Sequence, residues 1–298
     1  MEECAVSPLA STLQRKLKPL VSRNRGNLVA MNIVERGKKL SALCPDDEVF
    51  TLSWELILHR VYEQGGVSFY DGMDTVVDAG AHVGIFSLQA SQWASRVVSI
   101  EASRVNYDIL KLNIDRNEIL NIEPRHCALW NMSGEALHFE ALHHTGGGRV
   151  TDQSQLGEHG DTVESLSLDD LIVQIGKIDL LKIDIEGAEY EVLGACKSLS
   201  SISCIVGEMH LEHPNERHLL DSLVAQLEDA GFIVRLVTEK ELHSRDGLAR
   251  LLRNRSSLQG KTMTKALAAA YFAAPIEKPV RPSGATYELP VLVAHQPA

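Results

Sequence analysis

The chain has 298 residues, of which 44% are hydrophobic and 23% are charged, and its formal net charge is −11. This composition is close to that of an ordinary soluble protein, and it excludes a disordered chain, a collagen-like repeat and a disulfide-dense miniprotein. A protein that neutralises phosphates needs an excess of basic groups, so the acidic balance disfavours nucleic acid as a partner. We expect a ligand that is neutral, or an anion held in a local pocket.

The cysteines and the hydropathy pattern indicate the compartment. The five cysteines are scattered and odd in number, without a Cys-x-x-Cys spacing, which favours reduced thiols in a reducing compartment. No apolar run reaches the ~18 residues that span a bilayer, and the first residues lack the apolar core of a signal peptide. We therefore expect a cytoplasmic protein without a transmembrane segment.

The hydrophobic pattern predicts the elements in chain order. Residues 1–70 are mixed, with a strand expected over 27–34 and a helix over 54–63. From residue 74 on, apolar runs alternate with segments of helical spacing, which is typical of crossover units in a mostly parallel sheet. The predicted strands are 75–77, 96–100, 122–129, 163–168, 178–185, 202–206, 232–237 and 289–294, and the predicted helices are 85–93, 103–114, 169–175, 189–199 and 216–230. Residues 140–162 contain three consecutive glycines and many polar residues, which predicts a long loop of the kind that is usually functional or mobile.

A glycine turn follows the first strand of this series and opens a helix. It reads Asp78-x-Gly80-x-x-x-Gly84, and glycines in such a turn let the backbone approach a ligand closely. It does not match the Gly-x-Gly-x-x-Gly fingerprint of dinucleotide sites. Asp78 at the mouth of the turn would repel a pyrophosphate and suits a cationic group instead. S-adenosyl-L-methionine has that character, since it carries an ammonium and a sulfonium but no phosphate.

Glu101 ends the next strand and is the expected acidic partner of the turn. A carboxylate in this place can accept hydrogen bonds from both ribose hydroxyls of an adenosine cofactor. The alternative is a surface glutamate that follows a tight strand–helix turn. The remaining residues that we assign to the cofactor site are Ala81, His82, Ala102, Cys127, Ala128 and Asp184.

Charged residues interrupt the apolar strand at 178–185. Lys182 and Asp184 alternate along it and so point to the same side, and charges in an apolar strand are costly unless they are paired or functional. Asp184 stands at the carboxyl end, where open α/β sheets bind their ligands. Glu186 and Glu189 suit the first turn of the following helix, because carboxylates are favourable there.

Glu208 and His210 follow the neighbouring strand, again at alternate positions. If the cofactor is S-adenosyl-L-methionine and the acceptor is a hydroxyl, the reaction requires an aligned acceptor oxygen and a group that removes its proton. A histidine is the side chain whose ordinary pKa lies nearest neutrality. We predict that Lys182, Asp184, Glu208 and His210 form the catalytic set. Alternatively, Asp184, Glu208 and His210 hold a divalent cation that binds the acceptor oxygens and lowers their pKa.

Three blocks of the sequence carry a family resemblance. Residues 76–84 look like the first motif of the FkbM family of S-adenosylmethionine-dependent methyltransferases, although His82 replaces the usual asparagine. Residues 101–113 resemble the second motif, in which prolines usually stand at the positions of Ala102 and Arg104. The third block, at 167–171, 178–189 and 192–193, is the most specific, and Glu208-Met209-His210 matches the Glu-x-His that often follows the next strand.

The resemblance covers about residues 70–238, and it implies a fold and an activity. The implied fold is α/β: a seven-stranded, mostly parallel Rossmann-like sheet with helices on both faces and an antiparallel last strand, for which 289–294 is the candidate. We assign 71–298 to the methyltransferase domain, with 239–285 as a helical insertion, and 1–70 to an N-terminal segment that forms a lid or borders the substrate. The implied activity is O-methylation of a hydroxyl on a small-molecule acceptor, either a sugar or a secondary metabolite such as a polyketide or glycoside. The alternatives are a peptide or other nucleophile as acceptor, and a nucleoside-binding module without catalysis.

Overall fold

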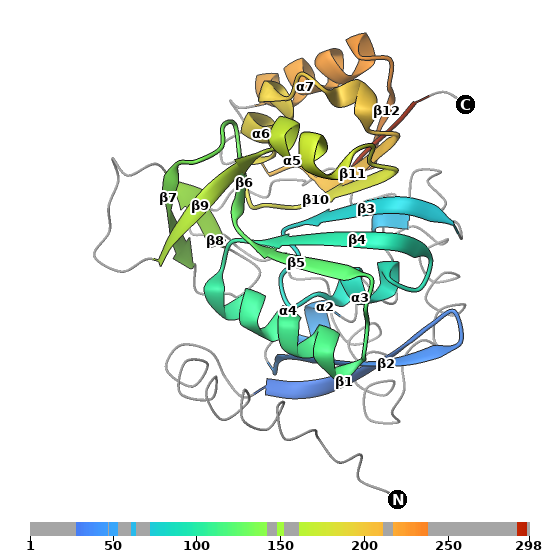
Figure 1. Ribbon diagram of the computed structural model, residues 1–298. Coiled ribbons are helices and arrows are strands. Elements are labelled where there is room, and N and C mark those ends of the chain that lie inside the picture. Colours follow the sequence, from blue (N-terminus) through green and yellow to red (C-terminus); the bar gives the residue numbers. More distant parts are fainter. Residues whose placement is uncertain are drawn as a thin grey trace, which may run out of the picture.

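The computed structural model describes residues 28–46, 48–52, 61–63, 72–141, 148–151, 161–210, 217–237 and 291–296. The predicted insertion at 239–285 and most of the helix predicted at 54–63 lie outside these ranges. Within them, a large central sheet is covered by helices on both faces (Figure 1).

The central sheet has seven strands in the order β12-β13-β11-β10-β3-β4-β5. All neighbours are parallel except β13, which runs antiparallel between β11 and β12. The strands are β3 Met73–Ala79, β4 Ala94–Glu101, β5 Ile122–His126, β10 Leu180–Ile183, β11 Cys204–Glu208, β12 Ile233–Val237 and β13 Val291–His295. The predicted fold class is therefore confirmed, including the antiparallel last strand.

The central strands are apolar at nearly every position because both of their faces are buried. Alternate residues of β3 enter different cores: Val76 packs on one face and Val77 on the other. Leu180 and Leu181 of β10 divide in the same way. This alternation follows from the two-residue period of a strand, and it is why these runs can be recognised in the sequence.

Two layers of helices cover the sheet (Figure 1). The helices α3 and α4 lie on one face, and α5, α6 and α7 lie on the other. Their bounds are α3 Ile85–Ala90, α4 Arg104–Arg116, α5 Leu168–Ile175, α6 Glu189–Ala195 and α7 Arg217–Asp229, with a short 3-10 turn, η4, at Leu199–Ser201. Ser103 and Ser167 cap α4 and α5 by accepting a backbone N–H three residues ahead, as N-cap serines do.

The described part of the N-terminal segment packs against the first helical layer. It comprises the hairpin β1 Leu28–Glu35 and β2 Lys38–Pro45, a single helical turn α2 at Val49–Leu52, and a 3-10 turn η2 at Val61–Glu63. Asn113 of α4 ties the hairpin to the glycine turn, because its side-chain amide bonds both backbone groups of Leu43 and the carbonyl of Val83. Residues 28–45 are thus packed into the core beside α4.

A second, four-stranded sheet branches from the end of β5, in the order β6-β9-β7-β8. Its strands are β6 Ala128–Trp130, β7 Ala136–Ala141, β8 Gly148–Thr151 and β9 Asp161–Ser167. Two predictions were wrong here. The strand predicted at 122–129 is split at Cys127, because β4 ends opposite His126 and the chain beyond it pairs with β9 instead. The long loop predicted at 140–162 contains β8 and the beginning of β9 in its described parts.

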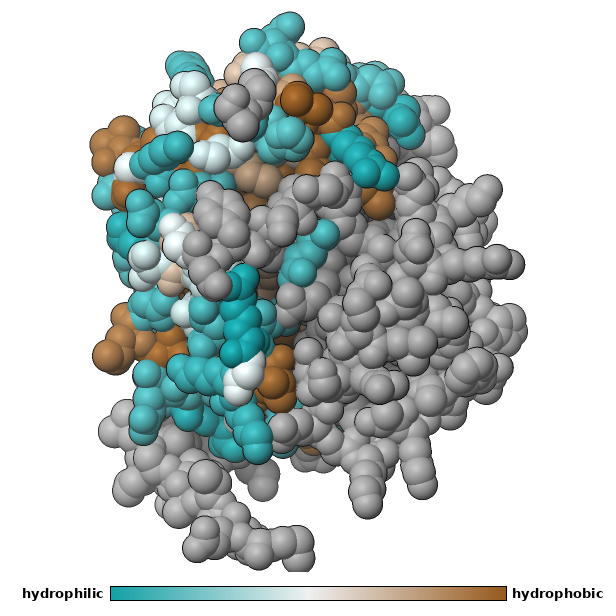
Figure 2. Space-filling view, turned by 90° about the vertical axis from the view of Figure 1, so that its right-hand side faces the viewer, coloured by the Kyte–Doolittle hydropathy of each residue, from teal (hydrophilic) through white to brown (hydrophobic). Residues whose placement is uncertain are grey.

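No helix within the described ranges combines the length and the apolar character needed to cross a membrane. The face drawn in Figure 2 shows small apolar patches separated by hydrophilic residues on the described part of the surface. The large exposed hydrophobic side chains come from separate places in the chain: Leu120, Met132, Val173, Leu219 and Ile233.

Candidate active site

The two glycines of the turn after β3 are required by the protein's own packing. Gly80 and Gly84 have φ of 74° and 88°, a region that side chains with a Cβ rarely adopt. A Cβ on Gly80 would lie 1.8 Å from the backbone oxygen of Asp184, and one on Gly84 would lie 2.4 Å from Leu110 Cδ1. These glycines therefore let the turn approach the end of β10 and helix α4, and their contact with a ligand stays a prediction.

The remainder of the turn is fastened to the end of β4. The backbone N–H of Ala81 donates to the carbonyl of Ile100 at 2.9 Å, and the N–H of His82 donates to Oε2 of Glu101 at 2.7 Å. His82 itself adopts a left-handed φ of 54°. Its Nε2 lies 3.1 Å from Oε2 of Glu48, which stands just before α2. The N-terminal segment therefore reaches the predicted cofactor turn through this contact.

Glu101 lies where the sequence predicts it, at the end of β4 beside the glycine turn. Its other oxygen, Oε1, accepts the backbone N–H of Ser103 at 2.8 Å. Burial raises the pKa of this carboxyl above its ordinary value, and the nearby His82 and the backbone N–H groups oppose that rise. Each carboxylate oxygen can accept more than one hydrogen bond, so acceptor capacity remains for hydroxyl groups.

The other predicted cofactor residues lie at the same edge of the sheet. Ala102 follows Glu101, and its carbonyl is 3.1 Å from Nε2 of His126. Cys127 is half-buried, and burial raises the pKa of its thiol to about 11, which makes it an unreactive side chain at neutral pH. Ala128 is buried with Leu137. The three residues surround the carboxyl ends of β4 and β5 with small and apolar groups.

Asp78 and Lys182 form a buried pair between β3 and β10. Lys182 Nζ lies 3.3 Å from Oδ1 of Asp78 and donates to the carbonyl of Gly80 at 2.8 Å. Asp78 also accepts the hydroxyl of Ser87 and is fully buried. Burial by itself would lower the pKa of Lys182, but Asp78 and Asp184 outweigh it and hold that pKa above its ordinary value. Asp78 thus meets a cation of the protein itself, Lys182, and its predicted contact with a ligand cation stays a prediction.

Asp184 follows β10 directly and keeps a partly exposed side chain. Tyr62 of η2 donates its hydroxyl to Oδ2 of Asp184 at 2.7 Å, and its ring lies 5.4 Å from Lys182 Nζ. Burial raises the pKa of a carboxyl, yet the charges of Lys182 and His210 and the Tyr62 hydroxyl outweigh it, so the pKa of Asp184 is lowered. Asp184 is thus an ionised carboxylate at the carboxyl end of the central strand.

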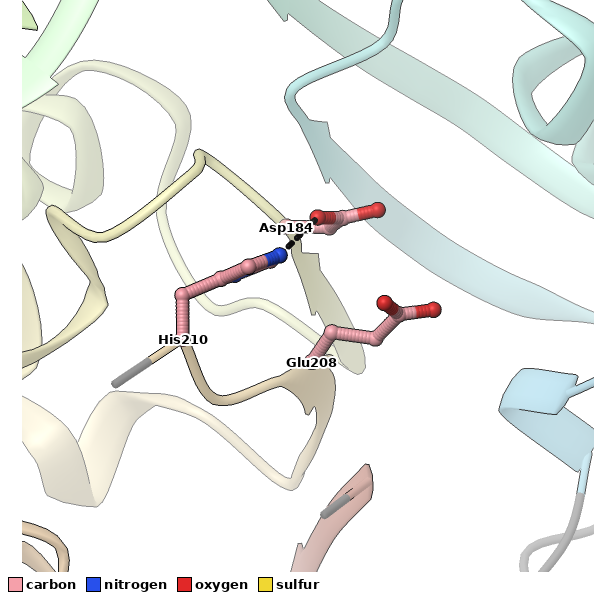
Figure 3. Close-up of side chains that lie close together, drawn as sticks. All are labelled: Asp184, Glu208 and His210. Carbon is pink, nitrogen blue, oxygen red and sulfur yellow. Dashed lines mark ion pairs between the residues drawn. The ribbon is translucent and has the colours of Figure 1, made fainter. Parts of the chain in front are cut away.

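Glu208 and His210 approach Asp184 from the end of the neighbouring strand β11. Figure 3 shows the carboxylates of Asp184 and Glu208 extending in the same direction, with the ring of His210 turned toward Asp184. One ligand atom of each of the three residues lies within 4.8 Å of the others. The structure therefore brings together the three residues that the sequence predicts as a catalytic or metal-binding set.

The ring of His210 is surrounded by carboxylates. Its Nδ1 is 3.0 Å from Oε1 of Glu189, and its Nε2 is 3.6 Å from Oε2 of Glu186 and 4.0 Å from Oδ1 of Asp184. Burial would lower the pKa of an imidazole, but the hydrogen bond to Glu189 and the charges around the ring raise it to about 10. His210 therefore carries a proton on both ring nitrogens at neutral pH.

Three residues at this edge escaped the sequence reasoning: Glu48, Tyr62 and Glu189. Glu48 and Tyr62 belong to a segment without a recognisable motif, so nothing in their neighbourhood signalled a contact with residues 82 and 184. Glu189 belongs to the most specific block of the sequence, but a glutamate at the start of a helix is explained by its position alone. Its partner His210 stands on another element, and only the fold brings the two together.

The positions of these residues coincide with a known domain. A profile described as the methyltransferase FkbM domain matches residues 78–234. The chain belongs to the FkbM methyltransferase family. The match runs from Asp78 through Glu101, Asp184 and His210, so the resemblance read from the sequence motifs is confirmed, and the glycine turn and the carboxylate cluster are parts of one FkbM methyltransferase domain.

One curated protein and two solved structures illustrate what this FkbM methyltransferase is similar to. Methyltransferase sdnD of Sordaria araneosa is 29% identical over 151 residues, which make up 40% of this chain and 58% of that protein. The chain thus spans little more than half the length of this relative. Among solved structures, a protein of Streptococcus mutans described as a methyltransferase in complex with SAH is 11% identical with a TM-score of 0.41, covering 80% of this chain and 94% of that chain. An rRNA methylase of Streptococcus thermophilus gives the same identity and TM-score, with coverages of 80% and 92%.

Proposed function

We propose that the protein transfers a methyl group from S-adenosyl-L-methionine to a hydroxyl of a small molecule, either a sugar or a secondary metabolite such as a polyketide or glycoside. The observation that carries this proposal is the cluster of Asp184, Glu208 and His210 at the carboxyl ends of β10 and β11. It lies across the topological switch point from the glycine turn and Glu101, and open α/β sheets bind their ligands at that point.

The chemistry of the surrounding groups suits this cofactor. The predicted cofactor edge offers the carboxylates of Glu101 and Asp184, whereas Lys182 is buried and directed at Asp78. Such an edge favours a ligand that carries an ammonium and hydroxyls over one that carries phosphates. We propose that Glu101 accepts the ribose hydroxyls and that residues 80–82, 102, 127 and 128 border the adenosine. When bound, S-adenosyl-L-methionine supplies a methyl group that its sulfonium already activates.

The residues of the chain then have to orient the acceptor oxygen and take its proton. Asp184 and Glu208 can accept hydrogen bonds from acceptor hydroxyls, which fixes the oxygen in place. Nε2 of His210 faces the same region, and in the neutral ring it can take a proton from a hydroxyl. Because His210 is protonated at neutral pH, it must first lose the proton on Nε2 before it can act as a base.

A divalent cation is a second candidate for the same cluster, because the three ligand atoms lie within 4.8 Å of one another. Two carboxylate oxygens and an imidazole nitrogen form a donor set that suits such an ion. Asp184, Glu208 and Nε2 of His210 would hold it, and it would lower the pKa of an acceptor hydroxyl. Turnover that EDTA abolishes and Mg²⁺ or Mn²⁺ restores would support the cation, whereas unchanged turnover in the chelator would leave the three residues as base and positioning groups.

A methyl-transfer assay tests the proposal directly. The purified protein is incubated with S-adenosyl-L-methionine and separate panels of glycosides, macrolide precursors and peptides, and methylated products are identified by mass spectrometry. A methyl ether formed only on a glycoside or macrolide precursor supports the proposal. Methylation of peptides alone would change the acceptor class, and cofactor binding without any methylated product would favour a nucleoside-binding module without catalysis.

A further inference from the structure

Glu189 is a carboxylate at the start of α6 with no exposed side-chain surface. Its Oε1 lies 3.0 Å from Nδ1 of His210. We propose that Glu189 is a positioning residue that holds His210 with its Nδ1–H directed inward and its Nε2 directed at the reacting edge. This inference rests on the proposed role of His210 in methyl transfer.

The carboxylate of Glu189 is itself fixed by the turn that follows β10. Oε1 accepts the backbone N–H of Ile185 at 2.9 Å, and Oε2 accepts the N–H of Gly187 at 3.0 Å. The turn is compact because Glu186 and Gly187 both have positive φ, of 58° and 108°. Glu189 therefore joins the backbone just beyond Asp184 to the ring of His210, and it sets the positions of both.

The donor and acceptor roles follow from these contacts. Both oxygens of Glu189 accept N–H groups, so Glu189 acts as a carboxylate, which has no proton to donate. The nitrogen that faces it must therefore carry the hydrogen. Any proton that His210 gains or loses in the reaction is then the one on Nε2, on the side of Asp184 and Glu186. The same orientation would serve a cation on Nε2, since a carboxylate behind a ligating histidine fixes its tautomer and ring orientation.

A simple role at the helix start does not explain this geometry. Glu191 stands in the same first turn of α6, but it is exposed and its Oε2 is 3.4 Å from the amide nitrogen of Asn131. Glu189 is instead buried and directed away from its own helix toward residues 185, 187 and 210. Glu191 is therefore the matched control, since it is the same residue type in the same helical turn without contact with His210.

The test combines kinetics and NMR on the full chain. Glu189→Gln removes the charge with little change in volume, and we expect it to lower kcat by about 10- to 100-fold while the affinity for S-adenosylhomocysteine stays within a few fold. Glu191→Gln should leave kcat unchanged. In a His210→Ala background, adding Glu189→Gln should change kcat by less than about twofold, because residues that act as a unit are not additive. If the double variant instead loses kcat by the product of the two single-variant factors, the proposal is overturned.

NMR provides a second measurement, which reads the orientation of the ring without any assay of turnover. A hydrogen-bonded Nδ1–H of His210, assigned by its absence in His210→Ala, should exchange slowly with water, and this protection should be lost in Glu189→Gln. A rapidly exchanging or absent Nδ1 proton in the wild type would overturn the proposal. If His210→Ala keeps the wild-type kcat, the proposed function of His210 fails, and the NMR result still decides whether Glu189 orients the ring.

Discussion

The oxygens of the Glu101 carboxylate accept the backbone N–H groups of residues 82 and 103. We propose that they also accept the ribose hydroxyls of the cofactor. Glu101→Ala should weaken the binding of S-adenosylhomocysteine, because two charge-assisted hydrogen bonds are lost, each worth about 1.5–3 kcal/mol. Calorimetry on the folded variant measures this loss. Glu123→Ala on the adjacent strand β5 is the control, because Glu123 is also a carboxylate but pairs with arginines at positions 96 and 125. An unchanged affinity in Glu101→Ala would place the ribose elsewhere.

His210 is the residue on which the proposed proton transfer depends. His210→Ala should lower kcat by about 10²–10⁴-fold, the usual contribution of a positioned base, with little effect on cofactor affinity. The pH profile gives an independent check. Only the neutral ring can take a proton, and its pKa of about 10 means that the neutral fraction grows roughly tenfold for each pH unit below that value.

The wild-type kcat/KM should therefore rise from about pH 7 to about pH 9, and the His210→Ala variant should lose this rise. A flat wild-type profile over this range would show that Nε2 does not titrate there as a base. A kcat for folded His210→Ala within a few fold of the wild type would transfer the base role to Glu208 or Asp184.

At the scale of elements, the contact between the turn after β3 and the end of β10 depends on one missing side chain. Gly80→Ala should unfold or strongly destabilise the protein, because its Cβ would overlap the backbone oxygen of Asp184 at 1.8 Å. Gly134→Ala provides the comparison, since Gly134 has a similar φ of 85° but nothing within 4 Å of the added Cβ. That control should lose only the about 1–2 kcal/mol that a left-handed residue costs. Equal losses of unfolding free energy in the two variants, measured by denaturant titration, would contradict this reading of the contact.

Most elements of the central sheet could be predicted from the sequence. The strands of the central sheet could be recognised because a strand buried on both faces is apolar at successive positions, as at 180 and 181. The grouping of Asp184, Glu208 and His210 could be predicted because the carboxyl ends of neighbouring parallel strands meet at one edge. The strands β7 and β8 could not, because they are short and lie in a polar region whose pairing depends on residues distant in sequence.

Within the site, the sequence failed where a partner comes from another element. The sequence did not show that Asp78 and Lys182 pair with each other, because they stand on different strands and meet only once both are buried. Tyr62 and Glu48 reach the site from a segment without a motif, and a local pattern cannot show which distant residue a tyrosine or glutamate will meet. The period of the hydrophobic residues shows helices and strands, but it does not show which single polar side chains pair across long distances in the sequence.

At the scale of the whole molecule, binding of the cofactor product should stabilise the native state. A ligand that binds only the folded protein adds about 2.7 kcal/mol at a concentration 100 times its Kd, which corresponds to roughly 5 °C in Tm for a chain of this size. We expect this shift with S-adenosylhomocysteine and none with NAD, because the glycine turn lacks the dinucleotide fingerprint and its edge is acidic. A comparable shift with NAD in thermal denaturation would contradict the assignment of the cofactor.

The position of β13 in the sheet has a consequence for the order in which the protein folds. β13 separates β12 from β11, so β12 can join the central sheet only through β13, once β13 has paired with β11. That pairing joins residues as distant in sequence as Cys204 and His295, and contacts of such long sequence separation form slowly. Until they form, β11 is an open edge strand, which is a template for unwanted pairing between chains. The strand that carries Glu208 is therefore among the last to be enclosed, and aggregation during refolding should begin there.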